Sequence, residues 1–90
     1  MSVKVNIPSY LQPYTGNQQV VEVSGSTAGE CLQDLVERHP EMARMLYEPD
    51  GRLLDYVSIF LNGEYAHVDE LAKPVCDGDE LHVLYILGGG

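Results

Sequence analysis

The sequence predicts an α+β domain with two layers, in which one main helix packs across one face of a sheet of four or five strands. Ninety residues are enough for a single domain with one core. Short segments with an alternating or β-branched pattern, separated by turn residues, indicate the strands. A longer segment with helical periodicity, which follows the second of these strands, indicates the helix.

The first two strands are predicted to form an antiparallel hairpin. Residues 3–7 alternate apolar and polar side chains, which is the period of a half-buried strand. Residues 19–23 form the second strand, with Val21 and Val23 pointing into the core. Between the two strands, residues 11–18 contain proline, glycine and polar residues, so we expect a loop there.

The helix begins at a capping box. Thr27 and Glu30 fit the T-x-x-E pattern, in which the threonine hydroxyl accepts from the Glu30 amide and the glutamate reaches back. The helix is expected to run to about His39, because Pro40 disfavours helical geometry in the residue before it. A further short helical turn is expected over residues 41–46. The predicted buried face of the helix consists of Ala28, Cys31 or Leu32, Leu35 and Val36.

The remaining strands follow a turn at residues 49–51. Residues 56–61 are rich in β-branched and aromatic side chains and form the third strand. Asn62-Gly63 supplies a tight turn, after which residues 64–73 are expected to form a short edge strand and an irregular or helical turn. Residues 81–86 form the last strand.

Alternation along the last strand predicts two different faces. Because only one face can pack on a single helix, an apolar pair is left on the outer face of the sheet. One face carries Leu81, Val83 and Tyr85, and the other carries His82, Leu84 and Ile86.

The charge balance restricts the partners. Fourteen acidic residues against five basic ones give a net charge of −9, which argues against nucleic acid and against anionic membranes. The charge suits a basic protein partner, or it serves solubility. No apolar run approaches the ~18–20 residues of a membrane span, and the N-terminus lacks the apolar segment of a signal peptide. We therefore expect a cytoplasmic protein.

Patterns that indicate an enzyme or a metal site are missing from the sequence. Cys31 and Cys76 lie in no CxxC or zinc spacing, and we interpret both as reduced, core-filling residues. The histidines are scattered, and the Asp77-Gly78-Asp79 fragment lacks the other donors of a calcium loop. We predict a protein that is not an enzyme, binds no metal and has no cofactor of its own.

The chain ends in three glycines directly after the last strand. Glycine is costly to order and packs nothing, so residues 88–90 are predicted to be a flexible tail on a domain formed by residues 1–87. Such a tail is slim enough to enter a narrow channel and carries a free α-carboxylate. The alternative is a frayed end or a cloning remnant.

Several motifs together resemble the ubiquitin-like sulfur carriers, the MoaD/ThiS family. They are the strand order, the Asn62-Gly63 turn, the Asp77-Gly78-Asp79-Glu80 turn before the last strand, and the terminal glycines. Within that family the chain is most similar to the carrier of cysteine synthesis, through segments 5–8, 11–16, 24–27 and 50–53. One departure is Ile86-Leu87-Gly88, where family members commonly have Ala or Val with a nearby proline.

The resemblance implies a fold and a chemistry. The fold is a β-grasp, with a mixed sheet of four to five strands. A MoeB/ThiF-like activating enzyme would use Mg-ATP to adenylate the carboxylate of Gly90. Sulfide or a persulfide would then displace AMP and leave a thiocarboxylate. Gly89 and Gly88 would let the tail pass into the acceptor enzyme, for example a PLP-dependent sulfhydrylase that makes cysteine or homocysteine.

Partner binding is expected on the outer sheet face, through Phe60, His82, Leu84 and Ile86. The alternative for these residues is a minor core under the early loop. Asp77, Asp79 and Glu80 would either steer a basic partner or cap a turn.

Three functional alternatives stay open on the sequence alone. The chain could be a carrier of the type of the molybdopterin-synthase small subunit. It could be a protein modifier conjugated through Gly90, or an adaptor with an inert tail. The sequence leaves the acceptor pathway and the oligomeric state open.

Overall fold

A single five-stranded sheet, in the order β2-β1-β5-β3-β4, organises the chain. The computed structural model describes residues 2–66 and 71–85. β1 pairs antiparallel with β2, and β5 lies between β1 and β3, parallel to the first and antiparallel to the second. The strands are β1 (Ser2–Asn6), β2 (Val20–Ser24), β3 (Val57–Leu61), β4 (Glu64–Ala66) and β5 (Glu80–Tyr85).

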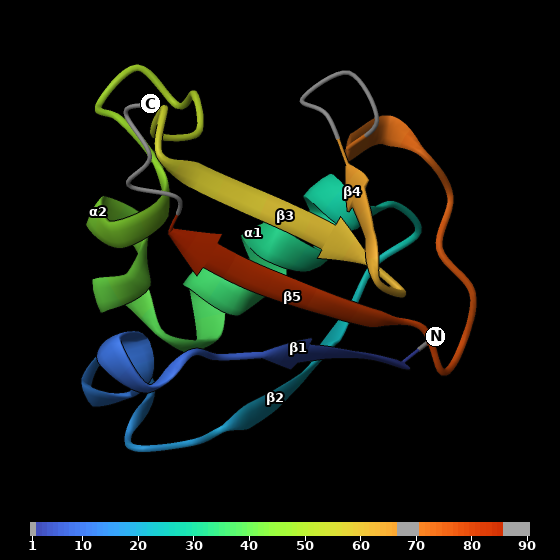
Figure 1. The fold of residues 1–90 in the computed structure, drawn as a ribbon, viewed down its shortest axis with the longest axis horizontal. Coiled ribbons are helices and arrows are strands. Elements are labelled where there is room, and N and C mark those ends of the chain that lie inside the picture. The colour runs from blue at the N-terminus through green and yellow to red at the C-terminus, as the bar shows by residue number, and fades with distance from the viewer. Residues whose placement is uncertain (1, 67–70, 86–90) are drawn as a thin grey trace.

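Helical segments cover one face of this sheet. Figure 1 looks onto the other face, with α1 lying behind β3 and β5. No helix of the described residues covers this side, which we call the open face. The predicted α+β class, with a mixed sheet and one main helix, is confirmed. The helical segments are α1 (Ala28–Arg38), α2 (Ala43–Leu46) and the 3-10 helices η1 (Ser9–Thr15) and η2 (Pro40–Met42).

The core lies between α1 and the covered sheet face. The alternation predicted for the first hairpin and the last strand is confirmed, because every second residue of β1, β2 and β5 is buried. Val36, predicted on the buried helix face, is only partly buried. The buried residues of these four elements are Val3, Val5, Val21, Val23, Ala28, Cys31, Leu32, Leu35, Leu81 and Val83.

The loop predicted at residues 11–18 is wrong in part, because the chain forms the 3-10 helix η1 there. Leu11 has no exposed surface and joins the core, which draws this connection against the domain. The buried Thr15 hydroxyl lies 3.0 Å from the Gln18 carbonyl oxygen. Gly16, at φ +63°, ends the helix in the left-handed region. Burial of Leu11 and Thr15 thus orders a segment whose composition is typical of a loop.

The prediction for the cysteines is correct for one of them. Cys31 is buried, and burial together with Asp34 raises the pKa of its thiol. Cys76 is exposed, contrary to the prediction. Its backbone N–H donates to Asp79 Oδ2 (2.7 Å), so Cys76 belongs to a surface turn rather than to the core.

The start of α1 is fixed by the predicted capping box and by a close approach at Gly25. Glu30 N–H donates to Thr27 Oγ1 (3.1 Å), and Glu30 Oε1 accepts from the N–H of Ser26 (2.9 Å) rather than of Thr27. A Cβ at Gly25 would lie 2.8 Å from the backbone nitrogen of Cys31. Only glycine therefore allows β2 to turn into the helix this tightly.

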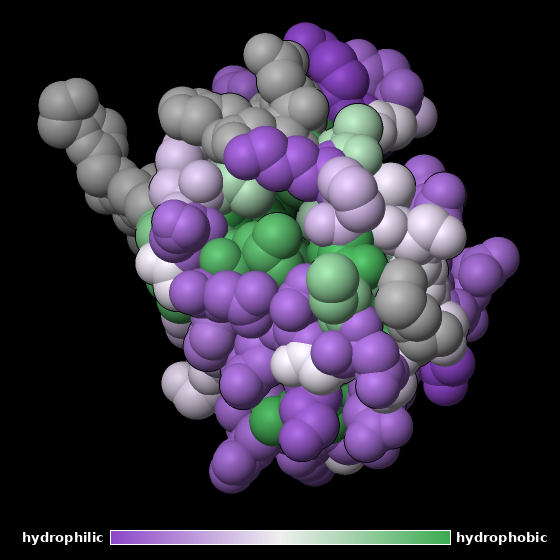
Figure 2. Space-filling view, turned by 90° about the vertical axis from the view of Figure 1, so that its right-hand side faces the viewer, coloured by the Kyte–Doolittle hydropathy of each residue, from purple (hydrophilic) through white to green (hydrophobic). Residues whose placement is uncertain are grey.

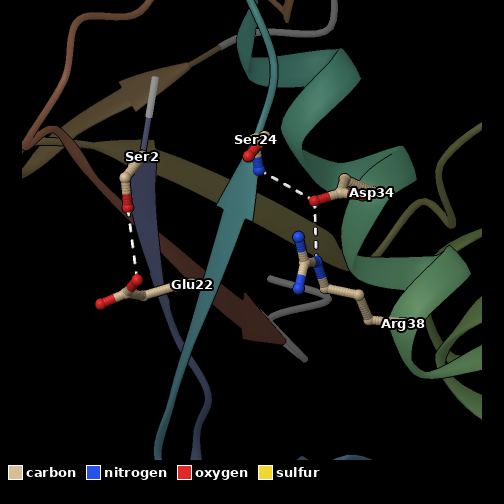
Figure 3. A network of polar contacts seen from close by, with 5 residues as sticks. All are labelled: Ser2, Glu22, Ser24, Asp34 and Arg38. Carbon is tan, nitrogen blue, oxygen red and sulfur yellow. Dashed lines mark hydrogen bonds and ion pairs between the residues drawn. The ribbon is translucent and has the colours of Figure 1, made fainter.

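Asp34 ties the helix to the end of β2 (Figure 3). Its Oδ2 accepts from the backbone N–H of Ser24 and from Arg38 Nε, both at 2.8 Å. The bond from Arg38, followed by the bond from Ser24, lowers the pKa of Asp34. On the neighbouring strands, Ser2 Oγ and Glu22 Oε2 lie 3.5 Å apart, a longer and more exposed contact.

Asp34→Asn is expected to lower the free energy of unfolding by about 1 kcal/mol at pH 7, because it weakens two charge-assisted hydrogen bonds. The folded-state pKa is depressed, so this contribution is present above the usual aspartate pKa of 3.8 and is lost as pH falls through the folded-state pKa. Urea unfolding of both proteins between pH 7 and pH ~2 measures the difference. Glu37→Gln, on the same helix, is the control; a gap between wild type and Asp34→Asn that stays constant with pH would contradict the assignment.

Candidate functional site at the end of β5

The predicted chemistry lies at the end of the chain, and the structure describes what leads to it. Ile86, Gly88, Gly89 and Gly90 lie outside the described residues. Tyr85, the last residue of β5, is the last residue that the structure describes. The site is therefore built from the end of β5 and from the open face beside it.

Among the strands that the structure describes, only β3 pairs with the end of β5. Pairing between β1 and β5 runs from Lys4↔Glu80 to Asn6↔His82. Pairing between β3 and β5 continues three residues further, to Val57↔Tyr85. β1 stops here because Pro8 and η1 lead the chain away. The last residues of β5 thus extend beyond β1 towards α2, as Figure 1 shows.

Three tyrosines meet at this point. The backbone N–H of Tyr85 donates to Tyr10 Oη (2.8 Å), and Tyr85 Oη donates to the carbonyl oxygen of Met45 (2.6 Å). The Tyr85 ring centroid lies 5.2 Å from that of Tyr10 and 5.0 Å from that of Tyr56, the second pair edge to face. Burial, followed by the neighbouring Tyr56, raises the pKa of Tyr85 to about 12, so its hydroxyl stays protonated and donates.

Tyr10, Tyr56 and Tyr85 form a group that we call the tyrosine cluster, and composition carries a weak signal for it. Six tyrosines against one phenylalanine is an excess of aromatic side chains that carry a hydroxyl. Their positions in the chain show no spacing that would group them. Only the fold brings η1, the start of β3 and the end of β5 together.

The open face carries the described part of the predicted partner surface. Phe60 and His82 are register partners on β3 and β5, and Leu84 follows on the same face. Leu84 is 40% exposed, and the Phe60 ring packs edge to face against Tyr65 of β4, with 5.6 Å between centroids. The early segment, which was the alternative cover for these residues, places Tyr10 against Tyr85 instead.

The other half of the open face is polar. Asn6 Nδ2 donates to Glu80 Oε1 (3.0 Å) and lies 3.4 Å from His82 Nε2. His82 therefore lies at the border between the apolar side chains of β3 and β4 and the polar side chains of β1. Such a border between apolar and polar side chains is typical of protein interfaces.

The neighbouring side of the molecule also has an apolar centre. Figure 2 shows the side at the right of Figure 1, where hydrophobic side chains gather in the middle and hydrophilic ones surround them. A shallow depression next to β4 is lined by Leu61, Glu64, Tyr65, Ala66 and Lys73.

The acidic turn before β5 has a structural role. The N–H of Ser2 donates to Asp77 Oδ1 (2.8 Å), and Asn62 Nδ2 donates to Asp79 Oδ1 (3.1 Å). The bonds from Cys76 N–H and from Asn62 lower the pKa of Asp79. These carboxylates hold the turn against β1 and the β3–β4 hairpin, in agreement with the capping alternative.

A metal-binding group and a helix that could cross a membrane are both absent from the described residues, 2–66 and 71–85. Within these ranges, no group of three or more His, Cys, Asp or Glu side chains is arranged to hold a metal ion. Within the same ranges, no helix combines the length and the apolar character that a bilayer crossing requires.

Comparison with known proteins decides the family. The model described as the ThiS family matches residues 5–90. The chain belongs to the ThiS family. The resemblance noted in the sequence is thereby confirmed.

Two relatives of this ThiS-family chain match it over most or all of their length. The sulfur carrier protein CysO of Mycobacterium tuberculosis (strain ATCC 25618 / H37Rv) is 36% identical over 93 residues, covering 100% of both chains. Small archaeal modifier protein 1 of Haloferax volcanii is 35% identical over 71 residues, or 78% of each chain. These relatives are named as a sulfur carrier and a modifier rather than as enzymes, in agreement with the prediction that this chain is not an enzyme.

Solved structures of the same relatives share the fold. The crystal structure of the Haloferax volcanii modifier has a TM-score of 0.86 at 29% identity, covering 100% of both chains. That of Mycobacterium tuberculosis CysO has a TM-score of 0.83 at 34% identity, covering 94% of this chain and 99% of the other. The crystal structure of a BexX/CysO complex from Amycolatopsis orientalis also matches, with a TM-score of 0.82 at 31% identity. The match covers 98% of this chain and 99% of the other. The β-grasp class is confirmed.

Proposed function

We propose that this chain is a sulfur carrier for the synthesis of cysteine or homocysteine, and that its sulfur is carried on Gly90. A carboxylate oxygen of Gly90 attacks the α-phosphorus of ATP, and pyrophosphate leaves. Hydrosulfide then attacks the acyl carbon of the adenylate, AMP leaves, and a thiocarboxylate remains. The observation that carries the proposal is the end-to-end match with the sulfur carrier CysO.

The partners follow from this chemistry. A MoeB/ThiF-like enzyme supplies Mg-ATP and the adenylation site, and a PLP-dependent sulfhydrylase in the cytoplasm accepts the sulfur. Phe60, His82 and Leu84 on the open face contact these partners, with Ile86 following them in the sequence. Gly88 and Gly89 let the tail enter the partner's channel, because a Cβ at either position would make the tail wider. A solved complex of a similar CysO with BexX supports the expectation of partner binding.

A second candidate function is protein modification. It is favoured by the similarity to small archaeal modifier protein 1 in both sequence and fold. The adenylate would form in the same way, but a lysine amine of a target protein would attack the acyl carbon. The product would be an isopeptide bond to Gly90 in place of a thiocarboxylate.

The intact mass of the protein isolated from its own cell tests both candidates. A carrier shows a mass increase equal to the exchange of one oxygen for one sulfur. A modifier shows conjugates of higher mass when ATP is added to a lysate. Because oxidation of the exposed Cys76 thiol to a sulfenic acid adds one oxygen and gives nearly the same mass increase, Cys76→Ser is measured in parallel. An unmodified mass without conjugates would rule out both candidates and leave the adaptor with an inert tail.

A further inference from the structure

The tyrosine cluster holds the last described residue of β5 at both its backbone and its side chain. A backbone N–H has one hydrogen, and that of Tyr85 is directed at Tyr10 Oη rather than at β3. In agreement, the N–H of Val57, opposite Tyr85, bonds to the carbonyl oxygen of Leu54. The pairing of β1 with β5 ends at His82, and at Tyr85 the Tyr10 hydroxyl accepts the hydrogen bond that a neighbouring strand would otherwise accept.

The side chain of Tyr85 is held by a hydrogen bond and by two ring contacts. Its hydroxyl bonds to the carbonyl oxygen of Met45 in α2, and its ring contacts the rings of both Tyr10 and Tyr56. Contacts from η1, α2 and the start of β3 therefore meet on one residue. Tyr10 is 48% exposed, so its ring is not part of the buried core, while its hydroxyl bonds to the end of β5.

A residue held in this way is already ordered before a partner binds the residues that follow it in the sequence. Ordering a residue of free chain costs conformational entropy, and a partner that binds the tail must meet that cost for every residue that is not already fixed. A fixed Tyr85 shortens the segment that has to be ordered on binding. The effect concerns binding of the tail before the chemistry, so it acts on KM rather than on kcat.

We propose that Tyr10 is a positioning residue for the carrier tail: its hydroxyl holds the N–H of Tyr85, the residue after which the tail segment begins. This inference rests on the proposed function, since it assumes that a partner enzyme receives the tail. Within residues 2–66 and 71–85, neither β1 nor any other strand pairs with Tyr85 on that side.

Tyr10→Phe tests the proposal, because it keeps the ring and removes only the hydroxyl oxygen that accepts. We expect the amide hydrogen of Tyr85 to exchange roughly 3–10-fold faster in the variant, with the exchange of Val83 unchanged. We expect KM for adenylation by the activating enzyme to rise by a similar factor of roughly 3–10, with kcat unchanged. Tyr10→Leu, which also removes the ring, is expected to give a larger rise in KM.

Tyr47→Phe is the matched control, since it removes a hydroxyl from a partly buried tyrosine outside the tyrosine cluster. It is expected to leave both measurements unchanged. Unchanged exchange at Tyr85 in Tyr10→Phe would overturn the proposal, and so would faster exchange without a change in KM. Failure of the wild-type protein to be adenylated is a different result: it would refute the proposed function and, with it, the role of Tyr10.

Discussion

Removal of the last two glycines is expected to reduce sulfur loading by about 100-fold or more, because the carboxylate no longer reaches the adenylation site. The thermal midpoint should not change, since the buried hydrophobic core is formed by residues between Val3 and Val83. The truncated chain ends in Leu87-Gly88, which leaves a bulky side chain where the partner's channel would receive a glycine. With the activating enzyme present, pyrophosphate release measures the adenylation step, and intact mass measures formation of the thiocarboxylate.

Removal of one glycine is the informative control. Deleting any one of Gly88, Gly89 and Gly90 gives the same sequence, which still ends in two glycines. Its reach is shorter by at most about 3.3–3.6 Å. Partial loading of this variant would show that the third glycine serves length rather than chemistry. Full loading of the chain that lacks two glycines would instead support the adaptor with an inert tail.

Leu81→Ala is expected to cost about 2–5 kcal/mol of unfolding free energy, because Leu81 is fully buried in the central strand. A domain of this length has a total stability of about 5–13 kcal/mol, so the variant would be close to unfolding at physiological temperature. Urea unfolding at 25 °C measures the loss. The large effect follows from the cavity that the neighbouring strands and α1 cannot close.

Leu84→Ala makes the same chemical change on the same strand and serves as the matched control. Leu84 is 40% exposed on the open face, so its unfolding free energy should change by no more than about 0.5 kcal/mol. Its affinity for the activating enzyme should fall roughly tenfold if the open face binds the partner. Equal destabilisation by the two variants would contradict the assignment of faces. Unchanged affinity of Leu84→Ala would contradict the partner surface.

Local pattern was sufficient for the strands, for α1 and for most of their buried residues. The alternation in β1, β2 and β5 predicted which residues are buried, because a strand that packs on one side buries every second side chain. The capping box predicted the first turn of α1, and Asn62-Gly63 forms its turn with both residues at positive φ. These features depend on residues that are near one another in the chain.

The part of the site that local pattern could not predict depends on distant residues. Tyr10 and Tyr85 are 75 positions apart, and their hydrogen bond exists because β5 lies next to β1 and extends beyond it. The order of strands in the sheet follows from long-range pairing, which periodicity does not encode. Burial of Leu11 turned an expected loop into η1, and the turn held by Asp79 placed Cys76 on the surface.

By itself, the sequence determined the two-layer α+β class, the buried faces and the glycine-ended chain on which the proposed chemistry depends. The three glycines need no packing to carry a carboxylate, so their signal is present in the sequence alone. Only the tertiary structure decided which residues hold Tyr85, the last described residue of β5. Tyr10, Met45 and Tyr56 come from separate elements, and the hydrogen bonds and ring contacts that fix Tyr85 form only when the sheet and helices bring these elements together.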